Sequence, residues 1–295
     1  MLRLRLVLPS GKSLEEPTIK LLEEADFPVH RNLREQEVTI RDPLISKTLI
    51  AHPRHIPDLV RKGFYDAGIC GLDCVLEAGV DIEVVAELPY SRTTSGSVEV
   101  VLFCSVDNPI QNAADIKPGS AILSEYPKCT REYFERLGIP VEVRESRGTT
   151  EAQIPEDYPY GVCVSETGLS LAVNRQKVIG VLFRSSTTLI ANRESMADPD
   201  KGEAIHMLGL LLKGTLEARE RVLLKMNVPA LKKEDVLGIL PALKEPTISE
   251  LVGGGYFAIE AVVFRKGVNS LIYQLLKEGA EDVIQLSISK VIRSW

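Results

Sequence analysis

The sequence predicts an α/β protein of two lobes joined by a hinge, followed by a small α+β domain. Short apolar strands alternate with amphipathic helices from residue 2 to about residue 88, as expected of an α/β unit with a largely parallel sheet, and a second α/β unit follows from residue 98. The strand-like segments 178–182 and 188–191 then lead back from the second lobe toward the first. Beyond residue 214 the elements follow the order β-α-β-β-α-β, which is typical of a ferredoxin-like domain. Two lobes joined by more than one crossing commonly bind a ligand between them.

The first lobe is expected over residues 1–88, with residues 184–212 returning to it. Its strands are predicted at 4–8, 38–40, 67–69 and 82–85, and its helices at 17–25, 56–62 and 73–77. A long helix is predicted from residue 201 to about residue 214. This lobe therefore alternates strand and helix almost from its first residue.

The second lobe is expected over residues 89–183, and a C-terminal domain over residues 213–295. In the second lobe, strands are predicted at 98–104, 120–123 and 141–144 and from residue 162, with a helix at 129–137 and prolines or glycines between them. In the C-terminal domain, strands are predicted at 222–228, 257–264 and 282–288, a short segment at 247–251, and helices at 233–240 and 268–278.

Composition narrows the class of protein. The 295 residues are 44% hydrophobic, but no apolar run approaches the roughly 20 residues that span a bilayer. Residues 1–9 alternate like a first strand rather than a signal peptide, so we expect a cytoplasmic protein without membrane contact. The net charge of -6 argues against nucleic-acid binding, which relies on clustered Lys and Arg. A small polyanion needs only a few donors at one cleft.

The five cysteines form no paired framework, which suits a reducing compartment. Cys70 and Cys74 come closest to the spacing of metal ligands. They have no second pair and no neighbouring histidine, so buried small hydrophobic residues are the favoured interpretation and a zinc site the weaker alternative. His30, His52, His55 and His206 are expected to have surface or structural roles.

The most informative stretch runs from residue 162 to residue 171. Apolar residues lead into Ser165, Thr167 and Ser170, whose hydroxyls can donate to phosphate oxygens. Gly168 would let the backbone approach an anion closely, and the first amides of a following helix would point at it. The stretch therefore predicts a phosphate-binding loop. The alternative is an ordinary helix start capped by hydroxyl groups.

Taken together, the chain resembles the long, regulated form of the ATP phosphoribosyltransferase family over essentially its whole length. Two pairs of stretches are the most specific: residues 165–171 with 186–192, and residues 222–228 with 240–247, the second pair marking the long form. Further similar positions are Leu8, Pro9, Gly11 and Lys12, the block from Ile56 to Asp73, Tyr126 with Pro127, and residues 148–151.

The resemblance implies a fold and a reaction. The fold would be a core like that of type II periplasmic binding proteins, with a C-terminal ferredoxin-like, ACT-like domain. The reaction would transfer the 5-phosphoribosyl group of phosphoribosyl pyrophosphate to N1 of the adenine of ATP, releasing pyrophosphate, in the first step of L-histidine biosynthesis. Mg²⁺ would be the cofactor, and L-histidine would inhibit through the C-terminal domain. The chain would be a homo-oligomer, from dimer to hexamer.

The resemblance also implies site residues. Phosphoribosyl pyrophosphate would be held by Ser165, Glu166, Thr167, Gly168, Leu169 and Ser170. ATP would be held by Gly11, Lys12, Gly71, Asp73 and Tyr126. Lys12, Glu151 and Glu166 would have catalytic roles. L-histidine would be bound by Thr247 and Ser249, and no residue is assigned to the metal. Adenine N1 attacks through a free lone pair, so the reaction needs no strong general base at its start.

Several positions depart from the family pattern. The first loop reads Ser10, Gly11 and Lys12 where Lys-Gly-Arg is usual, so a guanidinium fork is replaced by a point charge. Pro159 and Cys163 stand where acidic residues usually precede the phosphate loop. His52 and His55 stand where Arg and Asp are usual. These departures leave one alternative open, a catalytically weakened paralogue that senses histidine. A second alternative is a two-lobed protein that binds small anions, because the hinge architecture itself does not imply catalysis.

Overall fold

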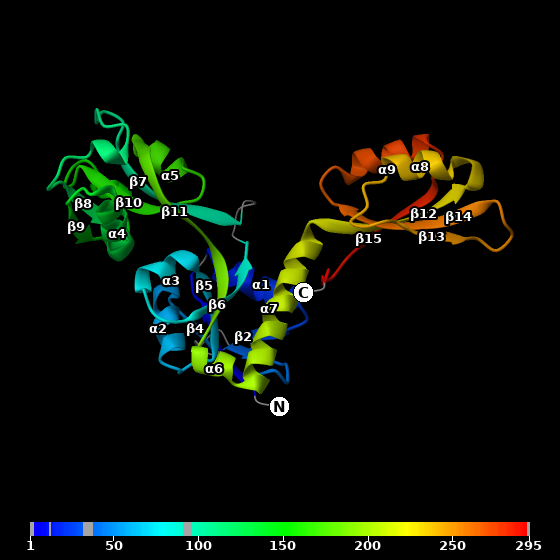
Figure 1. Ribbon diagram of the computed structural model, residues 1–295, viewed down its shortest axis with the longest axis horizontal. Coiled ribbons are helices and arrows are strands. Elements are labelled where there is room, and N and C mark those ends of the chain that lie inside the picture. The colour runs from blue at the N-terminus through cyan, green and yellow to red at the C-terminus, as the bar shows by residue number, and fades with distance from the viewer. Residues whose placement is uncertain (1–2, 12, 32–37, 91–95, 294–295) are drawn as a thin grey trace. The chain divides into compact units, whose positions relative to one another are not determined.

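The computed structural model describes residues 3–11, 13–31, 38–90 and 96–293. It divides into two compact units, Met1–Gly209 and Leu210–Trp295 (Figure 1). No helix in these ranges is both long enough and apolar enough to cross a membrane.

The main strands of the first unit form one nine-stranded sheet that extends through both lobes. In the first lobe the strand order is β4 (Ile45–Ala51), β1 (Leu4–Pro9), β5 (Ala67–Gly71), β11 (Gln176–Ala191) and β6 (Glu83–Leu88). The first three strands are parallel, whereas β11 runs antiparallel to β5 and to β6. The carboxyl ends of β4, β1 and β5 therefore lie along one edge of the lobe.

The second lobe repeats this order. Its strands follow as β9 (Glu142–Glu145), β8 (Ala121–Ser124), β10 (Tyr160–Ser165), β7 (Ser97–Ser105) and then the first part of β11. Again three parallel strands are followed by one antiparallel strand that arrives from the other lobe. Two lobes with the same order, each holding a strand that crosses over, confirm the predicted two-lobed core of the type II binding-protein class.

Strand β11 belongs to both lobes. Its residues up to Ser186 pair with β7, and from Thr187 onward they pair with β5 and β6. The sequence predicts two separate strands here, at 178–182 and 188–191, because the polar run from Arg184 to Thr188 breaks the apolar pattern. The structure has one continuous strand, since both neighbours supply backbone partners to the polar run.

Helices pack around the two lobes. The first lobe carries α1 (Glu15–Glu24), α2 (Ile56–Arg61), α3 (Leu72–Ala78) and α6 (Arg193–Ala197), and the second carries α4 (Pro127–Leu137) and α5 (Leu169–Val173). A hairpin of β2 (Val29–Arg31) and β3 (Val38–Ile40) and the short 3-10 turns η1 (Pro53–His55), η2 (Ala113–Asp115) and η3 (Thr150–Gln153) complete the unit. The long helix α7 (Pro199–Arg219) crosses the boundary between the units. All five cysteines are buried and free.

The second unit is a four-stranded antiparallel sheet with two helices. Its elements are β12 (Arg221–Pro229), η4 (Ala230–Lys232), α8 (Lys233–Ile239), β13 (Thr247–Glu250), β14 (Tyr256–Phe264), α9 (Val268–Lys277) and β15 (Glu281–Ser287). The strand order β13-β14-β12-β15 is that of a ferredoxin-like domain and confirms the predicted class. Both helices cover one face of the sheet (Figure 1), where Leu224, Val228, Ile259 and Leu275 form a core.

Candidate active site

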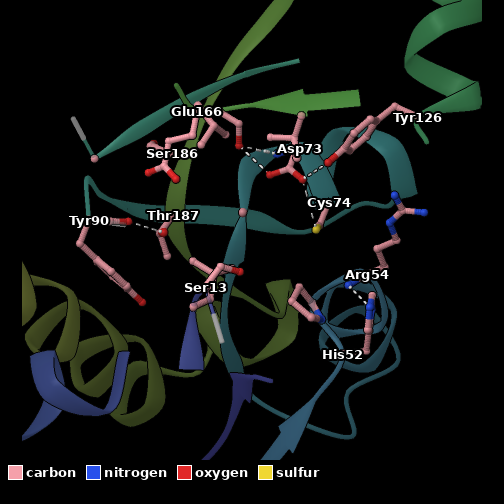
Figure 2. Close-up of a pocket in the computed structure, with 17 residues that line it drawn as sticks. Ser13, His52, Arg54, Asp73, Cys74, Tyr90, Tyr126, Glu166, Ser186 and Thr187 are labelled. Atoms are coloured by element: carbon pink, nitrogen blue, oxygen red, sulfur yellow. Dashed lines mark hydrogen bonds between the residues drawn. The ribbon is translucent and has the colours of Figure 1, made fainter. Parts of the chain in front are cut away.

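A pocket of about 320 Å³ lies between the two lobes of the first unit (Figure 2). It is bordered by the loops at the carboxyl ends of β1, β4 and β5 in the first lobe and of β8 and β10 in the second, where open parallel sheets usually bind ligands. Its lining comprises Ser13, Leu14, His52, Pro53, Arg54, Gly71, Asp73, Cys74, Tyr90, Gly96, Val98, Tyr126, Val164, Glu166, Ser185, Ser186 and Thr187.

Asp73 is the centre of a hydrogen-bond network that joins both lobes and the crossing strand. Its carboxylate accepts hydrogen bonds from the Ser185 hydroxyl at 2.7 Å and from the Tyr126 hydroxyl at 2.9 Å (Figure 2). The Asp73 amide donates in turn to the Ser185 oxygen at 2.9 Å. Asp73 lies in the first turn of α3, Tyr126 immediately before α4, and Ser185 in β11. The network therefore fixes the two lobes and their connection at one point.

Gly71 makes this arrangement possible. It precedes α3, and a Cβ added there would lie 2.1 Å from the Asp73 Oδ1 atom. Any other residue would displace the carboxylate from Ser185 and Tyr126. Gly71, Asp73 and Tyr126, three of the residues predicted to hold ATP, thus lie together in the wall of the pocket.

The Tyr126 hydroxyl stays protonated, and the ring of Tyr126 contacts the Arg54 guanidinium. Burial, together with the neighbouring Asp73 charge, raises the pKa of Tyr126 far above its usual value, so the hydroxyl remains a donor. The Arg54 guanidinium lies 5.3 Å from the centre of the Tyr126 ring and 3.6 Å from a carboxylate oxygen of Glu125. Among the described residues that line the pocket, Arg54 is the only Lys or Arg.

Glu125 lies beside the pocket at the end of β8. Its side chain is 15% exposed, and its carboxylate accepts a hydrogen bond from the Thr150 hydroxyl at 2.9 Å. Burial raises the pKa of Glu125, although Thr150 and Arg54 oppose the shift. Arg54 and Glu125 thus form a second link between the lobes.

The predicted phosphate loop lies at the rim of the same cleft. Strand β10 ends at Ser165, and α5 begins at Leu169 after Gly168, whose φ of 71° is left-handed. Glu166 lines the pocket, whereas the lining does not include Ser165, Thr167, Gly168, Leu169 or Ser170. The Ser170 hydroxyl donates to Glu151 at 2.9 Å, which brings the predicted catalytic carboxylate against the loop. No heavy atom of the described residues outside the immediate chain neighbours lies within 4 Å of a Cβ built at Gly168, so the glycine is required by the turn, not by close packing.

Other predicted residues lie elsewhere. Gly11 follows β1, with its amide donating to Glu15 at 3.1 Å, and is not part of the lining, although Ser13 is. Lys12 lies outside the described residues. Thr247 and Ser249 lie on β13 in the second unit, both exposed and paired with β14.

Cys163, one of the departures from the family pattern, lies away from the cleft surface. It is buried with Val101, Phe103 and Leu171 in a core of the second lobe. Burial and the nearby Glu151 and Glu125 charges raise the pKa of its thiol. The thiol therefore stays neutral and acts as a small apolar residue beneath the loop.

Several pocket residues are missed by the sequence analysis. His52, expected to have a surface or structural role, lines the pocket, and its Nδ1 atom accepts a weak hydrogen bond from the Arg54 amide at 3.4 Å. Burial, with His55 and Arg54, lowers the pKa of His52, which favours the neutral imidazole. Arg54 and Ser185 also carry no predicted role. The signal that could have found His52 and Arg54 is the strand before them, β4, which is itself absent from the predicted elements.

The fold and the cleft define a two-lobed ligand-binding core with an added antiparallel α+β domain. Residues 52–214 match the family model described as ATP phosphoribosyltransferase, and residues 218–290 match the one described as HisG, C-terminal domain. The chain belongs to the ATP phosphoribosyltransferase family, in the form that carries this C-terminal domain. The predicted function class, a transferase of histidine biosynthesis, is confirmed.

Individual relatives support the assignment. An ATP phosphoribosyltransferase of Pelotomaculum thermopropionicum is 38% identical over 291 residues, which cover 99% of this chain and 100% of that protein. One from Chlorobium phaeovibrioides is 36% identical, covering 98% of this chain and 97% of the other. Among solved structures, the ATP phosphoribosyl transferase (HisG:HisZ) complex from Thermotoga maritima has a TM-score of 0.60 at 22% identity, covering 72% of this chain and 98% of that one, which shows a shared fold.

Proposed function

We propose that the cleft of the first unit transfers the 5-phosphoribosyl group of phosphoribosyl pyrophosphate to N1 of the adenine of ATP, with release of pyrophosphate. The observation that carries this proposal is the pocket in which Asp73, Tyr126 and Glu166 converge at the ends of strands from both lobes. Family membership supports the reaction. Adenine N1 carries a free lone pair, so the work of the protein is to hold two polyanions in line, which can lower a barrier by roughly 7 to 11 kcal/mol.

Phosphoribosyl pyrophosphate would bind at the rim formed by residues 165–170. Backbone amides and the hydroxyls of Ser165 and Thr167 would donate to its 5-phosphate, with Gly168 and Leu169 supplying the turn. Ser170, whose hydroxyl donates to Glu151, would contribute its backbone amide at the start of α5. Glu151 and Glu166 would accept hydrogen bonds from the ribose hydroxyls. Glu151 is held in place by the Ser170 hydroxyl, and Glu166 lines the pocket.

ATP would bind against the wall made by Gly71, Asp73 and Tyr126. Gly11 and Lys12 would approach its triphosphate or the leaving pyrophosphate from the first loop. Arg54 is a further candidate for binding a phosphate, because it is the only Lys or Arg among the described residues that line the pocket. Fixed cations at this point would stabilise the charge that develops on pyrophosphate.

The carboxylates of the cleft suit Mg²⁺. This ion prefers oxygen ligands and is usually bound by one or two carboxylates together with substrate phosphates. We propose that free carboxylate oxygens of Glu166, which lines the pocket, and of Glu151, which is held at the phosphate loop by Ser170, accept hydrogen bonds from water molecules bound to the ion. When bound, the ion would neutralise negative charge on the leaving pyrophosphate.

The second unit would bind L-histidine, with Thr247 and Ser249 as candidate partners, and would lower activity in a homo-oligomer. The division into a first lobe (1–88 and 184–212), a second lobe (89–183) and a regulatory domain (213–295) belongs to this proposal. The change of β11 partners between Ser186 and Thr187 supports the placement of the lobe boundary near residue 184.

The test is formation of phosphoribosyl-ATP from the two substrates with Mg²⁺ and pyrophosphatase, with and without L-histidine. Turnover that histidine suppresses would support the regulated enzyme. Retained histidine binding without turnover would instead identify a sensing paralogue. A matched pair of variants, Asp73→Asn in the pocket and Asp81→Asn on the exposed surface, separates the site from a general loss of charge.

A further inference from the structure

Helices α3 and α4, which belong to different lobes, cap each other where they meet. The two carboxylate oxygens of Glu77, near the end of α3, accept hydrogen bonds from the amides of Lys128 at 2.9 Å and Cys129 at 3.0 Å. In return the Lys128 ammonium donates to the carbonyl of Leu76 at 3.2 Å. Each helix end thus receives the charge that its dipole favours, supplied by the other lobe.

Among the described residues of its own lobe, no side chain caps the start of helix α4. Tyr126 precedes it without a capping hydrogen bond from its side chain, and Pro127, at the first position, has no N–H group. The amides of Lys128 and Cys129 are the orphan donors of such a helix start. If the lobes moved apart, these amides and the Glu77 carboxylate would lose each other as partners.

The approach of the helices is close. A Cβ added at Gly79, which ends α3 in a left-handed conformation, would lie 2.4 Å from the Lys128 Cε atom. The glycine at this position leaves room for the Lys128 side chain to reach Leu76. Glycine at the end of α3 therefore serves both the turn and the contact between lobes.

The same two helices carry the pocket wall. Asp73 lies in the first turn of α3, four residues before Glu77, and Tyr126 lies directly before α4. The hydrogen bond between Tyr126 and Asp73 also spans the lobes (Figure 2), and it joins the same two chain segments as the Glu77 contacts. Holding the start of α4 against α3 therefore fixes the relative position of these two pocket residues.

We propose that Glu77 is a positioning residue that holds the lobes closed before substrate binds, by capping α4 across the cleft. The inference rests on the proposed function of the cleft for its effect on activity, but not for its effect on lobe closure. A chain that is closed only part of the time binds substrate more weakly in proportion to the closed fraction. Loss of the cap should therefore raise KM and leave kcat nearly unchanged at saturation.

The kinetic test compares Glu77→Gln with Glu87→Gln, an exposed carboxylate on β6 of the same lobe. Gln keeps the size of the side chain but loses the charge and one acceptor oxygen. We expect KM for both substrates to rise about tenfold in Glu77→Gln, with kcat within about twofold, and no change in Glu87→Gln. Unchanged KM, or a fall in kcat alone, would overturn the proposal.

A second measurement needs no activity. Because all five native cysteines are buried, spin labels can be attached selectively at Lys62→Cys in the first lobe and Glu135→Cys in the second, both exposed positions. The ligand-free chain should give one narrow distance distribution, and Glu77→Gln should broaden it toward longer distances. An identical distribution in both chains would refute the cap. If no transfer activity is found at all, this measurement still decides the cap, and only the proposed function fails.

Discussion

At the scale of single residues, the pocket depends on a donor that does not ionise. The Tyr126 hydroxyl is buried beside Asp73, and burial raises the pKa of Tyr126 well above its usual value. Ionisation would place two negative charges 2.9 Å apart, so the hydroxyl stays a donor through neutral pH. Tyr126 thereby orients one oxygen of Asp73 while Ser185 orients the other. The carboxylate is left with a fixed direction toward the cleft.

Replacing Tyr126 by Phe tests this orientation. The variant keeps the ring beneath Arg54 but removes one of the two hydroxyl donors to Asp73. A lost hydrogen bond to a charged group costs about 1.5 to 3 kcal/mol, so we expect kcat/KM for ATP to fall by about tenfold to a hundredfold. Tyr133→Phe, on the helix that Tyr126 precedes and outside the pocket lining, should leave kcat/KM unchanged. Equal kcat/KM values in the two variants would show that the Tyr126 hydroxyl has no role in the site.

At the scale of elements, sequence patterns predict most of the fold. The ferredoxin-like unit follows the predicted order because its two central strands have a clear apolar period, as the alternating burial of β12 and β14 shows. Strand β4 is not predicted, because Ser46, Lys47 and Thr48 interrupt its apolar residues, yet it pairs with β1 along its whole length. A tertiary partner outweighs local pattern there.

The same limit explains the site residues. Gly71, Asp73 and Tyr126 stand after elements that the sequence predicts, and the structure brings them together. His52 and Arg54 follow the unpredicted β4, so nothing in the local pattern indicates that they face a cleft. The link from Tyr126 to Asp73 spans 53 residues, and no short-range pattern contains it.

The start of α3 gives a prediction at this scale. The backbone of Gly71 has φ -71° and ψ 145°, which alanine adopts freely, so Gly71→Ala adds only a methyl group against Asp73. We expect at least a tenfold loss of kcat/KM with little loss of stability, because the methyl displaces the carboxylate and not the core. Gly238→Ala, where no heavy atom lies within 4 Å of the added Cβ, is the control for a glycine replacement. Full activity in Gly71→Ala would contradict the assigned role of Asp73.

At the scale of the whole first unit, one buried charge ties distant segments together. Asp66 is fully buried just before β5, and its carboxylate accepts hydrogen bonds from the Arg5 side chain and amide, from Ser195, and from Lys201 at 2.8 Å. Strand β1, helix α6 and the first turns of α7 are thereby held to one acid. Burial alone would raise the pKa of Asp66, but these partners outweigh it and hold the pKa far below its usual value.

Because the folded state lowers the pKa of Asp66, the free energy of unfolding depends on pH. A carboxyl group with a lower pKa in the folded state stabilises that state fully above its unfolded pKa of about 3.9, and the contribution is lost as pH falls toward the folded value. We therefore expect the urea midpoint of the chain to fall between about pH 5 and pH 3. Asp66→Asn should lower the free energy of unfolding by about 3 to 5 kcal/mol at pH 7, because Arg5 and Lys201 lose their buried partner. The urea midpoint of this variant should also depend less on pH between about pH 5 and pH 3. Asp81→Asn, at an exposed ion pair, should keep the pH dependence of the parent chain. If Asp66 governs the loss of stability in acid, its replacement must make the urea midpoint depend less steeply on pH. Parallel plots of midpoint against pH for the parent chain and Asp66→Asn would show that other carboxylates govern this loss.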